Sequence, residues 1–408
     1  MEAGIKMLQR YCPVCGFERG LLLHNQKFVL PDKHPLRNGY DVVLCERCKF
    51  LFADSSVTQH DYDAYYSNFS KYEDNHTSTG GGESGFDSIR LDEVAKQISN
   101  TFESRFIRIL DVGCANGGIL KKLKELGFLN VVGVDPSAAC VAHIKTDLLI
   151  EGYEASLFDM PESMGKFDLI ILSHVMEHIL DLKGCITKIS RFLNSNGRLY
   201  IEVPDATRYV DLLTSPFQDF NTEHINHFTQ TSLDNLFENS GFAKIGGGVK
   251  TIESAPGVPY PALYAFYKRE EVNNPVGFVV DNVIEGKTES YIKNSQVVIN
   301  NINFFLDKNF KRTESVLIWG TGQLTMKLLA MSNLKFLGIL NFIDSNPILT
   351  NKSIGEIAIM HPSQIKELDS GIKILITSTI HEVQIRRDIV EKYHLINPIF
   401  GLTDCLKI

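Results

Sequence analysis

The sequence of 408 residues lacks three kinds of segment. No apolar run reaches roughly 18 residues, so none is predicted to span a membrane. Clustered lysine and arginine are missing, and 49 acidic against 41 basic residues give a formal net charge of −8, which argues against a nucleic-acid partner. Residues 1–4 lack the charged-then-apolar pattern of a secretory signal. We therefore expect a cytoplasmic globular protein, and the length predicts two or three domains.

Four of the eight cysteines lie in the first 48 residues, and cysteine is scarce in the rest of the chain. These four form two C-x-x-C pairs, Cys12/Cys15 and Cys45/Cys48, which can offer four thiolates in a tetrahedron to Zn²⁺. We predict a structural zinc site, because four thiolates leave no open position for catalysis. Two disulfides are one alternative, which a reducing compartment disfavours, and unligated core cysteines are another. The remaining four are interpreted as small apolar residues: Cys114, Cys140, Cys185 and Cys405.

The chain around the second cysteine pair gives weaker signals. The stretch between the two pairs is long enough for a hairpin, and we predict strands at 28–30 and 40–44. After the second pair, several tyrosines fall within ten residues, among them Tyr65, Tyr66 and Tyr72. Such a run is compatible with a packed linker.

The most informative segment runs from Ile107 to Asp135. An apolar strand ends at Asp111, a glycine-containing turn follows with Gly113 and Gly117, and a second apolar strand, Val131–Asp135, ends in a carboxylate. This order is typical of a nucleotide-binding α/β unit, in which glycines let the backbone approach a ligand closely. The acid that leads the turn would repel a pyrophosphate and attract an ammonium or sulfonium group.

The turn resembles the first motif of class I S-adenosylmethionine-dependent methyltransferases, D/E-x-G-x-G-x-G, with Ala115 at the middle glycine. The resemblance implies that Asp111, Gly113, Ala115 and Gly117 pack against the cofactor. It also implies that Asp135 accepts hydrogen bonds from the ribose hydroxyls. Because alanine is small, we expect this departure to reshape the turn slightly. An ordinary βαβ turn without a ligand is the alternative.

The region up to residue 270 continues the same α/β order. In the methyltransferase family, the position of Asp159 often contacts adenine. A continuous apolar run at 166–173 predicts a buried parallel strand that ends at His174, which we expect near the cofactor, while Glu177 and His178 are expected to begin a helix. Further strands are predicted near 196–204, 242–245 and 262–267, giving the seven strands of a methyltransferase sheet.

A polar segment, 220–229, is the candidate for chemistry. It holds Glu223, His224 and His227 in a region where loops are expected to line the cleft. Methyl transfer from a sulfonium needs positioning and a base for the nucleophile, and a histidine suits that base at neutral pH. We predict His224 as the base and Glu223 as the group that orients it. The alternative is that these residues only fix the loop.

The C-terminal third repeats the strand-and-glycine theme after a helix predicted at 276–308. A strand at 315–319 leads to Gly320-Thr-Gly322, and a second strand ends at Asp344. Thr325 replaces the third glycine of the dinucleotide fingerprint, so we favour a structural or substrate-anchoring role over an NAD(P) site.

The whole arrangement resembles the nucleotide-deoxysugar C-methyltransferases. It implies an α/β protein with a zinc module (1–75), a class I methyltransferase Rossmann-like domain (76–270) and a second C-terminal Rossmann-like domain after a helical linker (271–408). In that family a keto-sugar nucleotide loses a proton next to its ketone, and the enolate carbon takes the methyl group. The family's base and its preceding glutamate correspond to His224 and Glu223, and a tyrosine that lines the sugar site to Tyr65, Tyr66 or, by preference, Tyr72.

Two other functions stay open. The same histidine could serve an O-methyltransferase of a surface-glycan or natural-product sugar. The alternative outside the enzymes is a non-catalytic protein that binds a nucleotide-linked sugar, or a scaffold held by its zinc module. In each case the expected partner is a small molecule.

Overall fold

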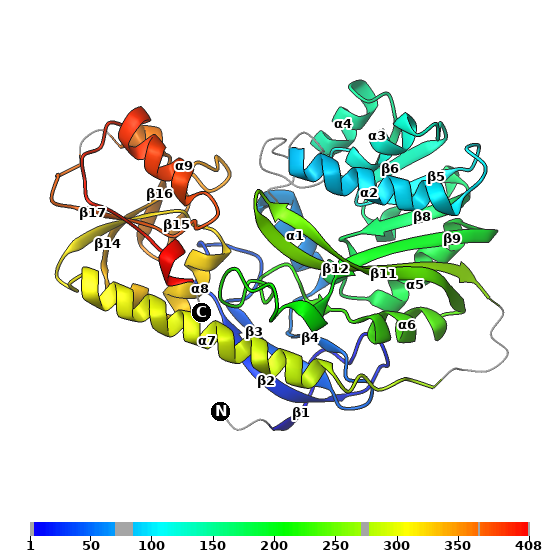
Figure 1. Cartoon of the computed structure of the whole chain (residues 1–408), viewed down its shortest axis with the longest axis horizontal. Helices are drawn as coiled ribbons and strands as arrows, with labels where there is room; N and C mark the ends of the chain where they lie inside the picture. The colour runs from blue at the N-terminus through cyan, green and yellow to red at the C-terminus, as the bar shows by residue number, and fades with distance from the viewer. Residues whose placement is uncertain (1–3, 70–84, 271–276, 366–367, 407–408) are drawn as a thin grey trace.

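The computed structural model describes residues 4–69, 85–270, 277–365 and 368–406. Three sheets organise these residues (Figure 1): a small antiparallel sheet from the N-terminal region, a large mixed sheet in the middle of the chain, and a mostly parallel C-terminal sheet. The helix α7 (Ile284–Asn309) runs beneath them and joins the C-terminal unit to the rest. This is a mixed α/β architecture, as predicted.

The small sheet has five strands in the order β1-β2-β3-β4-β10. Helix α1 (Gln59–Phe69) follows β4 in the chain. The strands are β1 (Ile5–Met7), β2 (Arg19–Lys27), β3 (Gly39–Cys45), β4 (Leu51–Asp54) and β10 (Asn226–His227).

The large sheet has seven strands in the order β11-β12-β9-β8-β5-β6-β7. The predicted seven-stranded sheet is therefore confirmed, with β5, β6, β7, β8 and β9 parallel and β12 and β11 antiparallel. Its strands are β5 (Ile109–Val112), β6 (Val131–Asp135), β7 (Glu151–Glu154), β8 (Phe167–Ser173), β9 (Leu193–Pro204), β11 (Phe242–Ala255) and β12 (Val258–Arg269). Its helices are α2 (Gly85–Thr101), α3 (Gly118–Glu125), α4 (Ala138–Thr146), α5 (Leu182–Phe192) and α6 (Gln230–Glu238).

The C-terminal sheet has six strands in the order β15-β16-β14-β13-β17-β18. The strands are β13 (Ser315–Trp319), β14 (Gly338–Ile343), β15 (Ser353–Ile354), β16 (Ile357–Met360), β17 (Lys373–Ile376) and β18 (Ile399–Gly401). Helices α8 (Gln323–Met331) and α9 (Glu382–Arg387) accompany them. A second Rossmann-like unit is therefore present.

The small sheet is buried on both faces. Successive side chains of a strand point to opposite sides, so β3 sends Val43 and Cys45 into the core of the large sheet. Its neighbours Val42 and Leu44 enter a second core, built with α7 and the C-terminal sheet. The N-terminal module thus works as a layer between the two Rossmann-like units.

The fifth strand of the small sheet comes from the middle of the chain. Asn226 and His227 of β10 pair antiparallel with Phe52 and Leu51 of β4, and the amide of Ala53 donates to the carbonyl of Ile225 at 2.9 Å. The polar segment that the sequence marks for chemistry is therefore part of the sheet of the cysteine module.

Two element predictions are wrong. The first hairpin strand is β2, and residues 28–30 leave the sheet because the amide of Val29 donates to the carbonyl of Met326 in the C-terminal unit at 2.9 Å. The helix predicted from residue 276 begins at Ile284, where the Asp281 carboxylate accepts the amides of Val283 and Ile284. Among the described residues, every helix is too short or too polar to cross a membrane.

A buried side chain joins the two modules at β10, and it gives a first prediction. The Asn226 amide donates to the carbonyls of Met176 and Ile179 at 2.8 and 2.7 Å, and its oxygen accepts from Arg10 at 2.9 Å. Asn226→Ala removes these three buried hydrogen bonds, although the carbonyl of Ile179 keeps Arg10 as a donor, and should lower the free energy of unfolding by about 2–4 kcal/mol. Urea denaturation followed by far-UV circular dichroism measures the loss.

The exposed Asn300 of α7 supplies the control for this prediction. Asn300→Ala should change the free energy of unfolding by less than about 0.5 kcal/mol. Equal urea midpoints for Asn226→Ala and Asn300→Ala would contradict the role of Asn226 as a link between modules.

Candidate functional site

The glycine-containing turn lies at the carboxyl end of β5 and begins helix α3. Gly113, Ala115 and Gly117 all have positive φ, at 75°, 44° and 77°. A Cβ on Gly117 would lie 2.7 Å from Ile144, and one on Gly113 would lie 2.8 Å from Val175. The turn is therefore packed tightly against helix α4 and against the loop after β8.

Asp135 holds this turn from the end of β6. Its two carboxylate oxygens accept the backbone amides of Ala115 and Ser137, each at 2.9 Å. The carboxylate thus ties the turn after β5 to the start of α4. The side chain is 9% exposed, so a bound hydroxyl would be largely shielded from water.

The Asp111 carboxyl is almost completely buried at the end of β5. Burial and the neighbouring Asp135 carboxylate raise its pKa to about 8, and Arg90 opposes the shift only in part. A buried acid of this kind is stabilised in its charged form by a cation brought beside it. The contact of Asp111 with a positively charged ligand group stays a prediction.

The other two predicted cofactor residues lie at the same edge of the sheet. Asp159 ends a 3-10 turn after β7, and its carboxylate accepts from Ser156. The amide of Ala155 donates to the carbonyl of Asp135, which brings this loop beside the end of β6. The contact of Asp159 with adenine stays a prediction.

His174 follows β8 in a left-handed conformation, with φ 56°. Its ring nitrogens lie 3.2 Å from Glu177 and 3.1 Å from Glu202, and both carboxylates are buried. Burial alone would lower the pKa of His174, but the two carboxylates reverse this and raise it. Both ring nitrogens of His174 therefore contact carboxylates. The next residue, Val175, packs against Gly113 of the glycine-containing turn.

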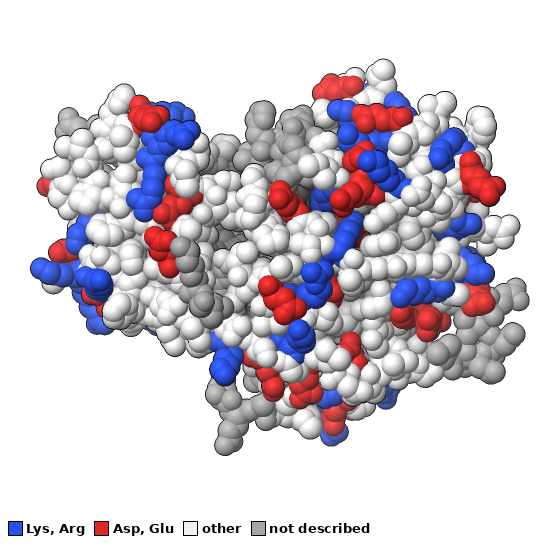
Figure 2. Space-filling view, viewed as in Figure 1, with Lys and Arg blue, Asp and Glu red and all other residues white. Residues whose placement is uncertain are grey.

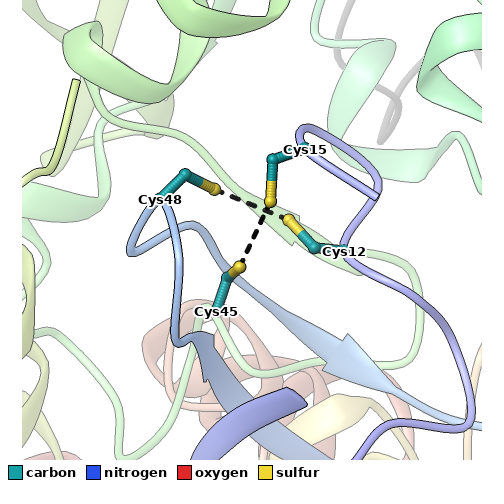
Figure 3. A group of neighbouring side chains, drawn as sticks. All are labelled: Cys12, Cys15, Cys45 and Cys48. Atoms are coloured by element: carbon teal, nitrogen blue, oxygen red, sulfur yellow. Dashed lines mark hydrogen bonds between the residues drawn. The ribbon is translucent and has the colours of Figure 1, made fainter. Parts of the chain in front are cut away.

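The four N-terminal cysteines converge in one buried cluster (Figure 3). The sulfurs of Cys12 and Cys48 are 3.6 Å apart, and those of Cys15 and Cys45 are 3.4 Å apart. Tetrahedral Zn–S bonds of about 2.3 Å place sulfurs roughly 3.7 Å from one another, so the cluster has the dimensions of a four-thiolate zinc site.

The two cysteine pairs share one backbone design. The amide of Gly16 donates to the carbonyl of Cys12, and that of Lys49 donates to the carbonyl of Cys45. Gly16 and Lys49 both have positive φ, at 74° and 57°. Each first cysteine amide also donates to the phenylalanine carbonyl two residues after its pair, so the two stretches read C-x-x-C-x-F. Two matching knuckles around one centre are the geometry expected for a metal held symmetrically.

The candidate catalytic pair lies between β4 and the loop after β8. The hydroxyl of Tyr65 donates to the Glu223 carboxylate at 2.8 Å, and Glu223 is 7% exposed. The ring of His178 lies edge-on to that of His224, with 5.0 Å between centroids. The Nδ1–H of His178 donates to the carbonyl of Glu223 at 3.0 Å. Glu223, His224 and His178 therefore form one cluster, and the 3-10 turn Met176–His178 takes the place of the helix start that the sequence predicted.

His227 lies apart from this cluster. It is completely buried among aromatic rings, with Phe220 at 5.1 Å and Tyr209 at 5.9 Å between centroids. Burial lowers the pKa of His227 to about 3, so it stays neutral. Its role is packing.

The C-terminal unit contacts the same segment from the opposite side. The side-chain amide of Gln323, at the start of α8, donates to the hydroxyl of Thr222 at 2.6 Å. The buried Lys327 donates to the carbonyl of Phe217, and burial lowers the pKa of Lys327 to about 7. The hydroxyl of Tyr40 in β3 donates to the carbonyl of Asn221 at 2.8 Å. Helix α8 of the C-terminal unit and β3 of the small sheet thus fix the segment that carries Glu223 and His224.

These contacts include residues that the sequence did not single out. Arg10, Gln323 and Lys327 belong to no recognisable motif, and only the folded chain brings them to residues 217–227. The repeated C-x-x-C-x-F string was a signal that the sequence did contain. Tyr72, the preferred tyrosine of the sugar site, lies outside the described residues, and the side chain of Tyr66 is not described either.

The C-terminal glycine turn is built like the first one, with an aspartate at the end of the next strand. Asp344 accepts the amides of Thr321 and Asn346, as Asp135 accepts those of Ala115 and Ser137. In addition, the Thr321 hydroxyl donates to Asp344 at 2.6 Å. This hydroxyl takes an acceptor position that a ribose would need, which supports a structural role for the turn.

The surface charges and one hollow of the protein bear on where a ligand can bind. Basic and acidic side chains are interspersed over the face in Figure 2, without an extended region of one sign. A hollow of about 420 Å³ lies at the opposite, amino-terminal edge of β5 and β6, lined by Arg108, Lys124 and Leu149 among others. Since ligands of open α/β sheets bind at the carboxyl edge, this hollow is not the cofactor site.

Comparison with known proteins identifies the central domain. Residues 86–245 match the family described as "Methyltransferase domain", and residues 312–395 match the family described as "C2185-like, N-terminal". Together with the seven-stranded sheet and its acid-led glycine turn, the first match shows a class I S-adenosylmethionine-dependent methyltransferase domain.

Among curated proteins, a ubiquinone biosynthesis O-methyltransferase of Pelagibacter ubique is 29% identical over 133 residues, which cover 30% of this chain and 55% of that protein. The human mitochondrial ubiquinone biosynthesis O-methyltransferase is 27% identical over 154 residues, covering 34% of this chain and 42% of that protein. The chain thus spans about half the length of the relatives it matches.

Among solved structures, the magnesium protoporphyrin IX methyltransferase of Synechocystis PCC 6803 with bound S-adenosylhomocysteine is 16% identical, with a TM-score of 0.42, covering 52% of this chain and all of that one. A 1,6-didemethyltoxoflavin N1-methyltransferase of Burkholderia thailandensis is 14% identical, with a TM-score of 0.39, covering 54% of this chain and 95% of that one.

The glycine turn gives a second prediction. Gly117→Ala places a methyl group against Ile144 at positive φ and should lower the free energy of unfolding by about 1–3 kcal/mol. Ala115→Gly removes a side chain from a left-handed position and should be neutral or stabilising by up to about 1 kcal/mol. Thermal unfolding of both variants tests the pair, and a Gly117→Ala protein as stable as Ala115→Gly would show that the turn is not constrained.

Proposed function

We propose that this chain binds S-adenosylmethionine at the carboxyl edge of the large sheet and transfers its methyl group to a sugar. The family match and the acid-led turn support the cofactor. Gly113, Ala115 and Gly117 would form the floor of the site, Asp135 would accept the ribose hydroxyls and Asp159 would lie at the adenine. Asp111 would face the cationic amino-acid part.

We propose further that Cys12, Cys15, Cys45 and Cys48 hold one structural Zn²⁺. The four sulfurs have the spacing of a tetrahedral site and share one buried position. Bound as four thiolates, the metal would link the two knuckles and stabilise β3 and β4. Through the pairing of β4 with β10, it would also fix the segment that carries Glu223 and His224.

The acceptor is proposed to be a nucleotide-linked keto-deoxysugar that is methylated on carbon. His224 would remove the proton next to the ketone, and the electrons of that C–H bond would form the enolate. Bound S-adenosylmethionine supplies an electrophilic methyl group, which the enolate carbon takes as the sulfonium leaves as a thioether. The proton stays on His224 until it passes to solvent.

The observation that carries this assignment is the buried contact of Tyr65 with Glu223 beside His224. A carboxylate held by a phenol and largely hidden from water is a fixed acceptor beside the histidine that follows it in the chain. Tyr65 reaches the pair directly, and Tyr72 remains the proposed residue for the sugar.

Methylation of a sugar hydroxyl is the second candidate. The curated relatives are named as O-methyltransferases, and a histidine base serves a hydroxyl as well as a carbon acid. In that case the base removes the hydroxyl proton and the oxygen takes the methyl group. The fold, the cofactor site and the zinc site are the same for both reactions.

The raised pKa of Asp111 predicts a pH-dependent affinity for the cofactor. Below about pH 8 the free protein holds Asp111 protonated, so binding of a cation must release a proton. Affinity for S-adenosylmethionine should therefore rise with pH up to about 8. The amino group of the cofactor titrates near 8 as well, so the ratio of wild-type to Asp111→Asn affinity is the quantity to follow. Isothermal titration calorimetry between pH 6 and 8 measures it, and a constant ratio would exclude the role of Asp111.

The base assignment predicts the effect of removing the imidazole. His224→Asn should reduce the rate of methyl transfer by about 10²–10⁴-fold, because a general base contributes that much, while the cofactor affinity stays unchanged. Single-turnover transfer from labelled cofactor to a panel of keto-deoxysugar nucleotides measures the rate. His227→Asn is not a matched control, because His227 is packed in the core; exposed His381→Asn serves instead.

Proton exchange separates the two candidate reactions. With S-adenosylhomocysteine in place of the cofactor, the wild-type protein should exchange the acceptor's α-proton with deuterated water if carbon is the nucleophile. Methylation of a hydroxyl without such exchange would assign O-methylation. Full turnover by His224→Asn would contradict the base in either reaction.

A further inference from the structure

We propose that Glu177, His178 and His224 form a second divalent-metal site, distinct from the four cysteines. These residues each present a ligand atom, and the atoms all lie within 4.8 Å of one another. Two imidazoles and one carboxylate are a ligand set that suits borderline cations such as Zn²⁺, Co²⁺ and Fe²⁺. The inward movement needed to reach bonding distance is about 1 Å, since Zn–N and Zn–O bonds are about 2.0–2.2 Å long.

The hydrogen bond of His178 prepares its ring for a metal. A carbonyl oxygen only accepts, so the Nδ1 that lies 3.0 Å from the carbonyl of Glu223 carries the proton. In the neutral ring the lone pair then lies on Nε2, the nitrogen that faces Glu177 at 4.0 Å. Metal-bound histidines almost always donate their other nitrogen in this way, which fixes the tautomer and the ring orientation.

The carboxylate of Glu177 supplies the second observation. Glu177 is 1% exposed; its Oε1 lies 3.2 Å from His174, while Oε2 is buried and makes no hydrogen bond to any residue that the structure describes. A buried carboxylate oxygen without a partner is costly, and a cation bound by the Glu177 carboxylate and the two imidazoles would offset this cost. His174, whose Nδ1 lies 3.2 Å from Oε1 of Glu177, would orient the carboxylate.

The backbone holds the three ligands together without help from a metal. The amide of Ile225 donates to the carbonyl of Glu177 at 2.8 Å, which ties the loop of His224 to the turn of the other two ligands. The ring contact of His178 with His224 adds to this. The site therefore exists before a cation arrives, and it takes transition-metal ions in preference to Mg²⁺ or Ca²⁺, which require oxygen ligands.

The consequence for catalysis, unlike the site itself, rests on the proposed function. A His224 nitrogen whose lone pair is on a metal cannot accept a proton. Free Zn²⁺ should therefore inhibit methyl transfer by occupying the base, while zinc at the four cysteines is required for the fold. The same metal would then have opposite effects at two sites of one chain.

The test uses the full chain loaded with zinc at the cysteines and titrated with Co²⁺. We expect one further equivalent of Co²⁺ to bind with ligand-field bands but without sulfur-to-cobalt charge transfer, because the site has only nitrogen and oxygen ligands. Glu177→Gln should weaken this binding about tenfold or more, in line with the cost of disturbing a metal site. His178→Gln should do the same if Glu177→Gln fails to fold. His143→Gln, which alters an exposed His–Asp pair on α4, is the control and should bind as the wild type does.

Three results would overturn the proposal. Binding of no further Co²⁺ would exclude the site, and equal binding by wild type and by both ligand variants would place the metal elsewhere. Turnover that requires the second metal would overturn its role as an inhibitor. Since the spectra do not depend on activity, a protein without methyl transfer that still binds the second Co²⁺ would count against the proposed function and not against the site.

Discussion

The pairing of β4 with β10 is the contact on which the candidate site depends. Through it, a segment between the ninth strand of the chain and helix α6 becomes the edge of a sheet built by the cysteine module. Glu223 and His224 lie directly before this short strand, so their positions follow from its register. A shift by one residue would turn Asn226 away from the carbonyls of Met176 and Ile179 and expose its buried amide.

Burial on both faces explains why this small sheet can hold the candidate site in place. Alternate side chains of β3 enter two different cores, so neither Rossmann-like unit can move away without exposing apolar surface. Arg10 adds a polar link: its guanidinium donates to the carbonyls of Ile179, Leu180 and Ile225. Burial lowers the pKa of Arg10 to about 10, which still leaves it charged at neutral pH. The C-terminal unit adds the hydrogen bond from Gln323 to the hydroxyl of Thr222.

Local chemistry made part of this arrangement predictable from the sequence. The acid-led glycine turn, the strand that ends at Asp135 and the paired cysteines are short patterns, and each needs only a few neighbouring residues to be recognised. The spacing of β5, β6 and β8 followed from continuous apolar runs.

The rest depends on contacts between distant residues. No periodicity marks a two-residue strand such as β10, and residues 28–30 look like a strand until the amide of Val29 finds its partner in the C-terminal unit. The cluster of Tyr65, His178 and His224 arises in the same way. The second glycine turn shows the converse case, in which a recognisable pattern carries an internal hydroxyl, that of Thr321, at the acceptor a ligand would use.

The most direct test of this account is the removal of the zinc that we propose for the cysteine cluster. Hydrogen exchange of Ala53, Ile225 and the two residues of β10, measured with turnover and cofactor affinity on the same samples, reports on the link. The account predicts that the metal-free chain loses protection at β4 and β10 and loses methyl transfer, while S-adenosylmethionine still binds to the large sheet. Protection and turnover that survive removal of the metal would contradict it.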